Sequence, residues 1–256
     1  MPLGDPFIEL TTVDSTNNYA MAQVQIGTGH HGTAYFAHEQ TAGKGQRGKT
    51  WTTMPGENLI LSLILKPRQL STGDSFLLSA TIANACYDFF TKYAGDEIKI
   101  KWPNDLYWRD RKTGGILIEN VIRNEYINLS IVGIGLNINQ TTFGNLIHPV
   151  SLKQITGKSF NPVELAKELC FFLDDHYNRL EAYCKEKQFG VKNQKRGARI
   201  LEYYTANLYK RDSRVRLRKG NVVFETTMKG VSDRGNLITE DVMVREFTFG
   251  EVEWIL

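Results

Sequence analysis

Hydrophobic residues recur along the chain with two different periods, and their alternation predicts an α+β protein. Apolar residues three or four positions apart mark three amphipathic helices. These helices cover residues 75–93, 162–186 and 196–208. A fourth helix is predicted after Ser15 and Thr16, whose hydroxyl groups favour a helix start, and it should end near the glycines at 27 and 29.

Short runs rich in β-branched and aromatic residues predict the strands. They cover residues 7–13, 33–37, 59–65, 98–101, 106–108, 115–122 and 126–134. Turn residues stand between some of them, as at Pro103-Asn104-Asp105 and Arg123-Asn124. Strands and helices together predict a mixed β-sheet backed by helices, in a first domain of residues 1–209.

The pattern changes after Lys210, where short alternating runs are broken by glycine-containing turns. The runs cover residues 214–217, 222–228, 236–239 and 247–254. Such spacing is typical of a five-stranded barrel of about forty-five residues. We therefore expect a small second domain of residues 210–256.

Composition narrows the class of protein. The 31 basic and 28 acidic residues leave a net charge of +3, too little to indicate nucleic-acid binding by charge alone. The three cysteines lack CxxC spacing and the five histidines lack metal-ligand spacing, so neither a disulfide framework nor a zinc site is expected. No leader-like segment and no apolar run of about 18 residues is present. We expect a cytoplasmic protein without a membrane segment.

A loop at residues 43–51 interleaves three glycines with three cations. Backbone N–H groups and basic side chains arranged in this way can surround a phosphate. The spacing does not match a P-loop, because the first glycine stands at the wrong distance from Gly48-Lys49-Thr50. Taken alone, such a segment is more often a solvated surface loop.

Three further segments combine turn or strand residues with chemically useful groups. In Lys101-Trp102-Pro103-Asn104-Asp105 the aspartate could hold Mg²⁺, although such a turn often satisfies only its own backbone. Lys112-Thr113-Gly114-Gly115 sets an ammonium and two glycines at the mouth of a strand, where a hairpin with a surface lysine is the simpler interpretation. Residues 133–137 place glycines where side chains would block a pocket.

Taken together and in order, five motifs resemble the biotin protein ligase family. They are residues 14–17, 43–51, 101–105, 112–117 and 133–137. The resemblance extends over essentially the whole chain, because the last segment is similar to the SH3-like barrel that follows the catalytic domain in this family. It implies the class II synthetase-like biotin–lipoate ligase fold. It also implies ATP-dependent activation of biotin as biotinyl-5′-AMP and transfer to one lysine of a biotin carboxyl carrier protein, such as the acetyl-CoA carboxylase subunit.

The resemblance also implies roles for individual residues. The expected biotin site comprises Ser15, Thr16, Asn17, Gln40, Gly43, Lys44, Lys112, Gly115 and Ile116. The expected ATP and adenylate site comprises Lys44, Arg47, Trp51, Asn104, Asp105, Lys112 and Asn137. Lys112 and Arg47 are the expected catalytic residues, and Asp105 is the expected Mg²⁺ contact. The reaction joins two anions, so these cations would offset the repulsion and stabilise developing charge.

Two positions depart from the family pattern. Gln46 stands where some members carry another arginine, so retention of the adenylate is expected to differ, and Lys44 replaces a frequent arginine with a non-planar cation. Thirteen residues precede Asp14, too few for a winged helix-turn-helix, so no DNA binding is expected. The edge strands of the predicted sheet could pair with those of a second copy, so a sheet-mediated homodimer stays open.

Two other functions remain open from the sequence. A lipoate–protein ligase would share the fold and the adenylation chemistry, but it should lack the pairing of WPND with GGIL. A non-enzymatic nucleic-acid-binding module could use the basic loop and residues 211–219 as its surface, although the low net charge argues against it. An adaptor role would leave all five motifs unexplained.

Overall fold

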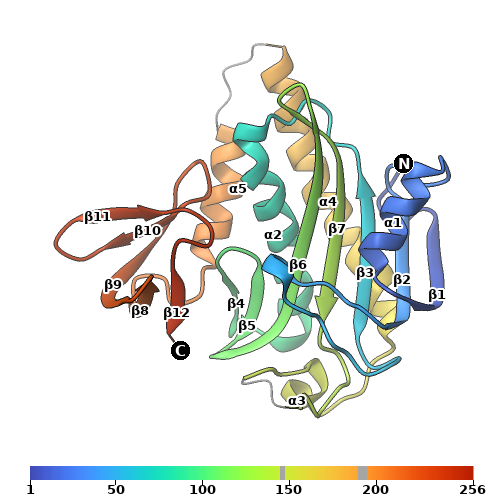
Figure 1. Cartoon of the computed structure of the whole chain (residues 1–256), viewed down its shortest axis with the longest axis horizontal. Coiled ribbons are helices and arrows are strands. Elements are labelled where there is room, and N and C mark those ends of the chain that lie inside the picture. The colour runs from blue at the N-terminus through green and yellow to red at the C-terminus, as the bar shows by residue number, and fades with distance from the viewer. Residues whose placement is uncertain (145–147, 190–194, 256) are drawn as a thin grey trace.

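A seven-stranded mixed sheet forms the centre of the protein (Figure 1). The computed structural model describes residues 1–144, 148–189 and 195–255. The strands are β1 (Phe7–Val13), β2 (Ala34–Gln40), β3 (Leu59–Leu65), β4 (Ile98–Lys101), β5 (Asp105–Trp108), β6 (Arg111–Arg123) and β7 (Tyr126–Leu136). Their order is β1-β2-β3-β7-β6-β5-β4, with β1 and β2 parallel and all other neighbours antiparallel. This confirms the mixed sheet predicted from the sequence.

Helices cover both faces of this sheet. In Figure 1, α2 (Ser75–Ala94) and α4 (Pro162–Gln188) lie behind it, whereas α1 (Thr16–Gln25) lies in front. The helix α5 (Lys195–Ala206) lies beside α2. Alternation along β2 explains the two layers, because Phe36 joins the large core with α2 and α4, and Tyr35 packs with Ala20 of α1. A sheet covered on both faces accounts for β3, in which every residue is buried and all but Ser62 are apolar.

The predicted helices agree with the structure to within a few residues. Three short elements were not predicted, namely α3 (Leu152–Thr156) and two 3₁₀ turns at Gln46–Gly48 and Thr72–Asp74. A capping box marks the start of α3, since Ser151 and Gln154 each bond to the other's backbone N–H. Among the described residues, no helix is both long and apolar enough to cross a membrane.

The C-terminal segment forms a five-stranded antiparallel sheet. Its strands are β8 (Arg214–Lys219), β9 (Val222–Val231), β10 (Leu237–Glu240), β11 (Val244–Phe247) and β12 (Glu253–Ile255), in the order β11-β10-β9-β8-β12. The predicted run of residues 247–254 contains only the last residue of β11 and the start of β12, and β11 itself was not predicted. A turn containing Gly250, with φ of +84°, separates β11 from β12, which lie at opposite edges of the sheet. The domain division after residue 209 stays a prediction.

The C-terminal sheet packs against the turn that joins β4 to β5. The indole Nε1 of Trp102 donates to the carbonyl of Gly235 at 2.9 Å, and the Trp102 ring lies edge-on to Phe249 at 6.1 Å. A Cβ atom at Gly235 would lie 2.0 Å from the ring of Phe76, so only glycine permits this approach. These contacts bring the turn between β11 and β12 next to the motif at residues 101–105.

Candidate active site

A cavity of about 740 Å³ lies between the seven-stranded sheet, the start of α1, the loop of residues 43–51 and the turn between β11 and β12. Thirteen of the fourteen predicted site residues line it. They are Ser15, Thr16, Asn17, Gln40, Lys44, Arg47, Trp51, Asn104, Asp105, Lys112, Gly115, Ile116 and Asn137. Gly43, the first residue of the loop, is buried, and a Cβ atom there would lie 2.3 Å from the backbone oxygen of Trp51.

One end of the cavity is lined by polar, uncharged groups, with the Lys44–Glu119 ion pair beside them. The Gln40 side-chain oxygen accepts hydrogen bonds from the backbone N–H of Thr16 at 2.8 Å and from its hydroxyl at 3.1 Å. Ser15 occupies the N-cap of α1, but its side chain makes no capping hydrogen bond. Its hydroxyl group is therefore not committed to the helix start and lines the cavity instead.

The amide of Asn17 is held in one orientation. Its Nδ2 donates to Glu119 at 2.7 Å, and its Oδ1 lies 2.6 Å from the hydroxyl of Ser62. A Cβ atom on residue 133 would lie 2.4 Å from this Oδ1, so Gly133 provides the space that the amide occupies. The glycine predicted to keep a pocket open therefore makes room for a polar side chain of the site.

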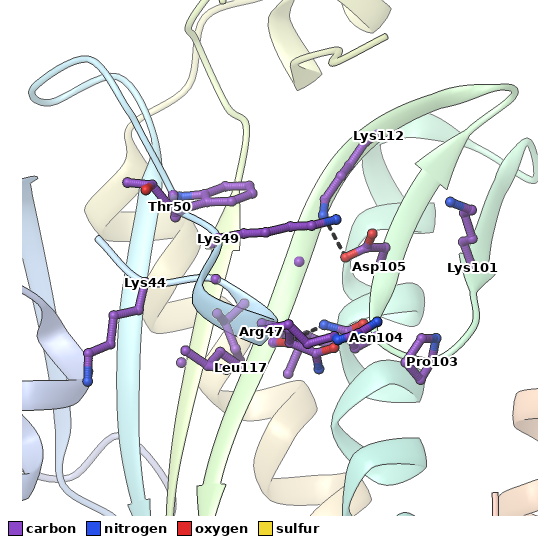
Figure 2. Close-up of a pocket in the computed structure, with 18 of the residues that line it drawn as sticks. Lys44, Arg47, Lys49, Thr50, Lys101, Pro103, Asn104, Asp105, Lys112 and Leu117 are labelled. Atoms are coloured by element: carbon purple, nitrogen blue, oxygen red, sulfur yellow. Dashed lines mark hydrogen bonds and ion pairs between the residues drawn. The ribbon is translucent and has the colours of Figure 1, made fainter. Parts of the chain in front are cut away.

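The opposite end of the cavity carries several cations. Lys112 Nζ lies 2.7 Å from Asp105 Oδ1, and Gly115 leaves room for this pair because a Cβ atom there would lie 3.2 Å from the carboxylate. In the view of Figure 2, the side chain of Lys49 extends from the loop toward this pair, and Arg47 extends toward Asn104. This end of the cavity is suited to a ligand with negative charge.

Lys101 adds a further ammonium group to the cavity wall. Burial lowers the pKa of Lys101 to about 8, although the Asp105 carboxylate acts in the opposite direction. Its Nζ lies 4.8 Å from the ring centre of Tyr107 and 5.3 Å from that of Trp254, a strand residue of the C-terminal sheet. Two aromatic rings thus shelter this amine from water.

The loop of residues 43–51 is a narrow hairpin over the sheet. Lys44 and Thr50 pair as an isolated bridge, and the N–H of Gly45 donates to the carbonyl of Lys49 at 2.6 Å. At the tip, Arg47 adopts a positive φ of 57°, and its guanidinium donates to the carbonyl of Gly250 at 3.4 Å. The C-terminal sheet therefore supports the tip of the loop.

Trp51 closes the base of the loop against the sheet. A Cβ atom at Gly135 would lie 2.6 Å from the indole ring, so the ring packs directly on the backbone of β7. The indole Nε1 is buried and has no hydrogen-bond partner in the part of the chain that the structure describes. A buried donor without a partner on a cavity wall is a candidate contact for a ligand acceptor.

Asn104 and Asn137 line the cavity but also fix its framework. Asn104 Nδ2 donates to the carbonyl of Ile116 at 2.5 Å. The Nδ2 of Asn137 lies within 3.4 Å of the carbonyls of Lys112 and Val150. Their side-chain nitrogens are thus committed to neighbouring backbone, which leaves the side-chain oxygens for any contact with a nucleotide.

No cluster of three or more His, Cys, Asp or Glu side chains able to hold a metal ion occurs in residues 1–144, 148–189 and 195–255. Sequence reasoning missed several residues of the site. They are Lys49, Ser62, Lys101, Glu119, Phe249, Gly250 and Trp254. Lys49 and Lys101 stood inside motifs that had been singled out, whereas the others reach the site only through the fold.

A comparison of sequences decides the family. The profile of the biotin/lipoate A/B protein ligase family matches residues 9–137, half of the chain. The chain belongs to the biotin/lipoate A/B protein ligase family. This membership confirms the resemblance carried by the five motifs, all of which lie within or at the boundary of the matched segment.

Two curated relatives in the family resemble part of the chain. The bifunctional ligase/repressor BirA of Escherichia coli is 36% identical over 129 residues, which cover 50% of this chain and 39% of the relative. The biotin–[acetyl-CoA-carboxylase] ligase of Paracoccus denitrificans is 33% identical over 163 residues, which cover 60% of this chain and 66% of the relative. The matched segment thus spans less than two thirds of either relative.

A solved structure extends the similarity of fold to almost the whole chain. The biotin protein ligase from Aquifex aeolicus, in complex with biotin and ATP, superimposes with a TM-score of 0.74 at 24% sequence identity. The alignment covers 96% of this chain and 97% of that structure. It therefore includes the C-terminal five-stranded sheet as well as the family segment, and it confirms the predicted fold class.

Proposed function

We propose that this protein activates biotin with ATP to biotinyl-5′-AMP and transfers the biotinyl group to a lysine of a biotin carboxyl carrier protein. The observation that carries the proposal is the polarity of the cavity, which is neutral and hydrogen-bonding at Asn17 and cationic at Lys112 and Lys49. Biotin has the same polarity, with a neutral ureido head and an anionic carboxylate at the end of an apolar tail.

The neutral end favours biotin over lipoate. Ser15, Thr16, Asn17 and Gln40 provide hydroxyl and amide groups, which suit a ureido ring that both donates and accepts hydrogen bonds. The dithiolane of lipoate has no N–H or O–H group, so it would leave these buried polar groups without compensation. The relatives named above as biotin ligases support the same choice.

In the first step, the biotin carboxylate would attack the α-phosphorus of ATP, and pyrophosphate would leave. The protein contributes alignment and charge rather than a covalent intermediate. Lys112 would lie beside the reacting anions at the cationic end of the cavity, and in Figure 2 Lys49 extends from the loop toward it while Arg47 extends toward Asn104. Cations fixed in a partly dehydrated cavity lower the repulsion between the two anions and stabilise charge that develops in the transition state.

Magnesium would enter with ATP as part of the substrate. Mg²⁺ is usually held by one or two carboxylates together with phosphate oxygens and water. Asp105 lines the cavity, and its single carboxylate fits an ion delivered by the nucleotide. When bound, the ion would add positive charge at the phosphates, while Lys112 keeps Asp105 oriented toward them.

In the second step, a lysine of the carrier protein would attack the mixed anhydride and release AMP. The adenylate must be kept from water until the carrier binds. The loop of residues 43–51 covers the cavity and is supported by Gly250, so it is the element placed to provide this shelter. Gln46, which replaces an arginine of some family members, removes one cation from that cover.

The test is intact-mass spectrometry of a biotin carboxyl carrier domain incubated with the protein, biotin and Mg-ATP. We expect one biotinyl group to be added, and only when all components are present. A parallel incubation with lipoate and a lipoyl acceptor domain should give no addition. Lipoylation without biotinylation would reverse the choice of substrate, and no addition in either incubation by the folded protein would refute the ligase function.

A further inference from the structure

A single carboxylate outside the cavity lining connects the two parts of the site. Glu119 lies on β6, two residues beyond Leu117, which lines the cavity. Its Oε2 accepts a hydrogen bond from Asn17 Nδ2 at 2.7 Å, and its Oε1 lies 3.4 Å from Lys44 Nζ. One side chain thus contacts both the neutral end of the cavity and the loop that covers it.

The first of these contacts determines how Asn17 faces its neighbours. A carboxylate can only accept hydrogen bonds, so it must face the NH₂ group of the Asn17 amide. The carbonyl oxygen of the amide is then turned to the hydroxyl of Ser62, at 2.6 Å. The Leu117 carbonyl also accepts from this NH₂ group, at 3.5 Å, but Glu119 is the closer acceptor and carries a charge.

The second contact tethers the loop. Lys44 and Glu119 are both partly exposed, with 42% and 37% of their side chains accessible, so the pair is weak and sensitive to salt. The other supports of the loop are at its base, where Trp51 packs on Gly135, and at its tip, where Arg47 donates to Gly250. A weak tie between these two supports suits a loop that must open for each ligand.

We propose that Glu119 is a positioning residue that fixes the Asn17 amide and tethers the loop through Lys44. The head-binding end of the cavity and its cover are therefore coupled through one side chain. The identity of the ligand in this inference rests on the proposed function, whereas the tether does not.

Two substitutions separate the two contacts. Glu119→Gln keeps an oxygen that accepts from Asn17, but it removes the charge that attracts Lys44. Glu119→Ala removes both contacts. Glu97→Gln is the matched control, because Glu97 forms an exposed ion pair with Arg109 and does not line the cavity.

The tether is tested by limited trypsin digestion, followed by intact mass to measure cleavage after Arg47. We expect Glu119→Gln to raise the cleavage rate about threefold, the size expected for one exposed ion pair, and Glu97→Gln to leave it unchanged. In a Lys44→Met background, Glu119→Gln should have no further effect, and high salt should remove its effect in the parent chain. Equal cleavage of the parent and Glu119→Gln proteins would overturn the tether.

The Asn17 contact is tested by equilibrium dialysis with labelled biotin. We expect Glu119→Ala to weaken binding about tenfold or more, because the buried Asn17 amide keeps only the more distant Leu117 carbonyl as an acceptor, at 3.5 Å. We expect Glu119→Gln to bind within about twofold of the parent. Parent-like binding by Glu119→Ala would overturn this part of the inference. A parent protein that fails to bind biotin would instead refute the proposed function, and the digestion would still decide the tether.

Discussion

Substitution of Gly133 by alanine tests how tightly the head-binding end of the cavity is built. The added Cβ atom would lie 2.4 Å from Asn17 Oδ1 and 3.0 Å from its Cγ. The amide would have to move by about 1 Å to restore ordinary contact distances. Since Asn17 is held by Ser62 at 2.6 Å and by Glu119 at 2.7 Å, this movement breaks at least one of the two hydrogen bonds.

The size of the effect follows from the lost hydrogen bond. An unpaired buried polar group costs about 1–3 kcal/mol, so the free energy of unfolding should fall by that amount. Biotin affinity should fall by about ten- to a hundredfold, since 1.4 kcal/mol corresponds to a factor of ten. Thermal or urea unfolding and equilibrium dialysis measure the two quantities.

Two variants show whether the clash is the cause. Gly73→Ala is the matched control, because the nearest atom to a Cβ atom at that position is 3.8 Å away, and it should change neither quantity. In an Asn17→Ala background there is no amide to displace, so Gly133→Ala should add no further loss of stability. Unchanged stability and biotin affinity in the single Gly133→Ala variant would refute the packing argument.

Three further predictions concern charged groups. Lys112→Ala should reduce adenylate formation, measured by pyrophosphate release, about a hundredfold or more. Its unfolding midpoint should stay near that of the parent. Undiminished pyrophosphate release would remove this lysine from the mechanism. Burial raises the pKa of Asp88, but hydrogen bonds to His176 and Tyr203 outweigh it and hold the pKa below 3.8. Ionised Asp88 should therefore stabilise the fold above that pH and lose its effect as the pH falls through the lower, folded-state pKa. The difference in the free energy of unfolding between parent and Asp88→Asn should shrink on acidification to pH 3. A constant difference would contradict this. Burial lowers the pKa of Lys101 to about 8. The pH dependence of its acetylation by acetic anhydride, measured by peptide mass spectrometry, should therefore have a midpoint near that pH. A midpoint above about 10, the value for an unperturbed lysine, would count against the aromatic shelter.

The sequence predicted elements best where one face of an element is buried over many residues. The helices α2 and α4 have long apolar stripes, and both were predicted within two residues of their ends. The five-residue helix α3 is too short to show a period, although its Ser151 and Gln154 capping box was a usable signal. The four-residue strand β11 was not predicted, because its sequence of Val, Arg, Glu and Phe shows no regular alternation of apolar and polar residues.

The candidate site was predicted as far as its residues lie in motifs. Lys112 and Asp105 became candidates because they stood beside glycines or in a turn, whereas Ser15 was assigned through the resemblance of its motif to the family. Glu119 and Ser62 stood inside apolar strands, where nothing local distinguished them from ordinary strand residues. Their roles arise from the register of β3, β7 and β6, which is a property of the folded sheet.

The support of the loop tip by Gly250 makes the cavity sensitive to local unfolding. Arg47 belongs to the loop of residues 43–51, whereas Gly250 and Trp254 belong to the C-terminal sheet and its turn. Local opening of the C-terminal sheet would remove the wall beside Arg47 and Lys101 without requiring the seven-stranded sheet to unfold. The polar end of the cavity would then keep its shape while the cover loses its support.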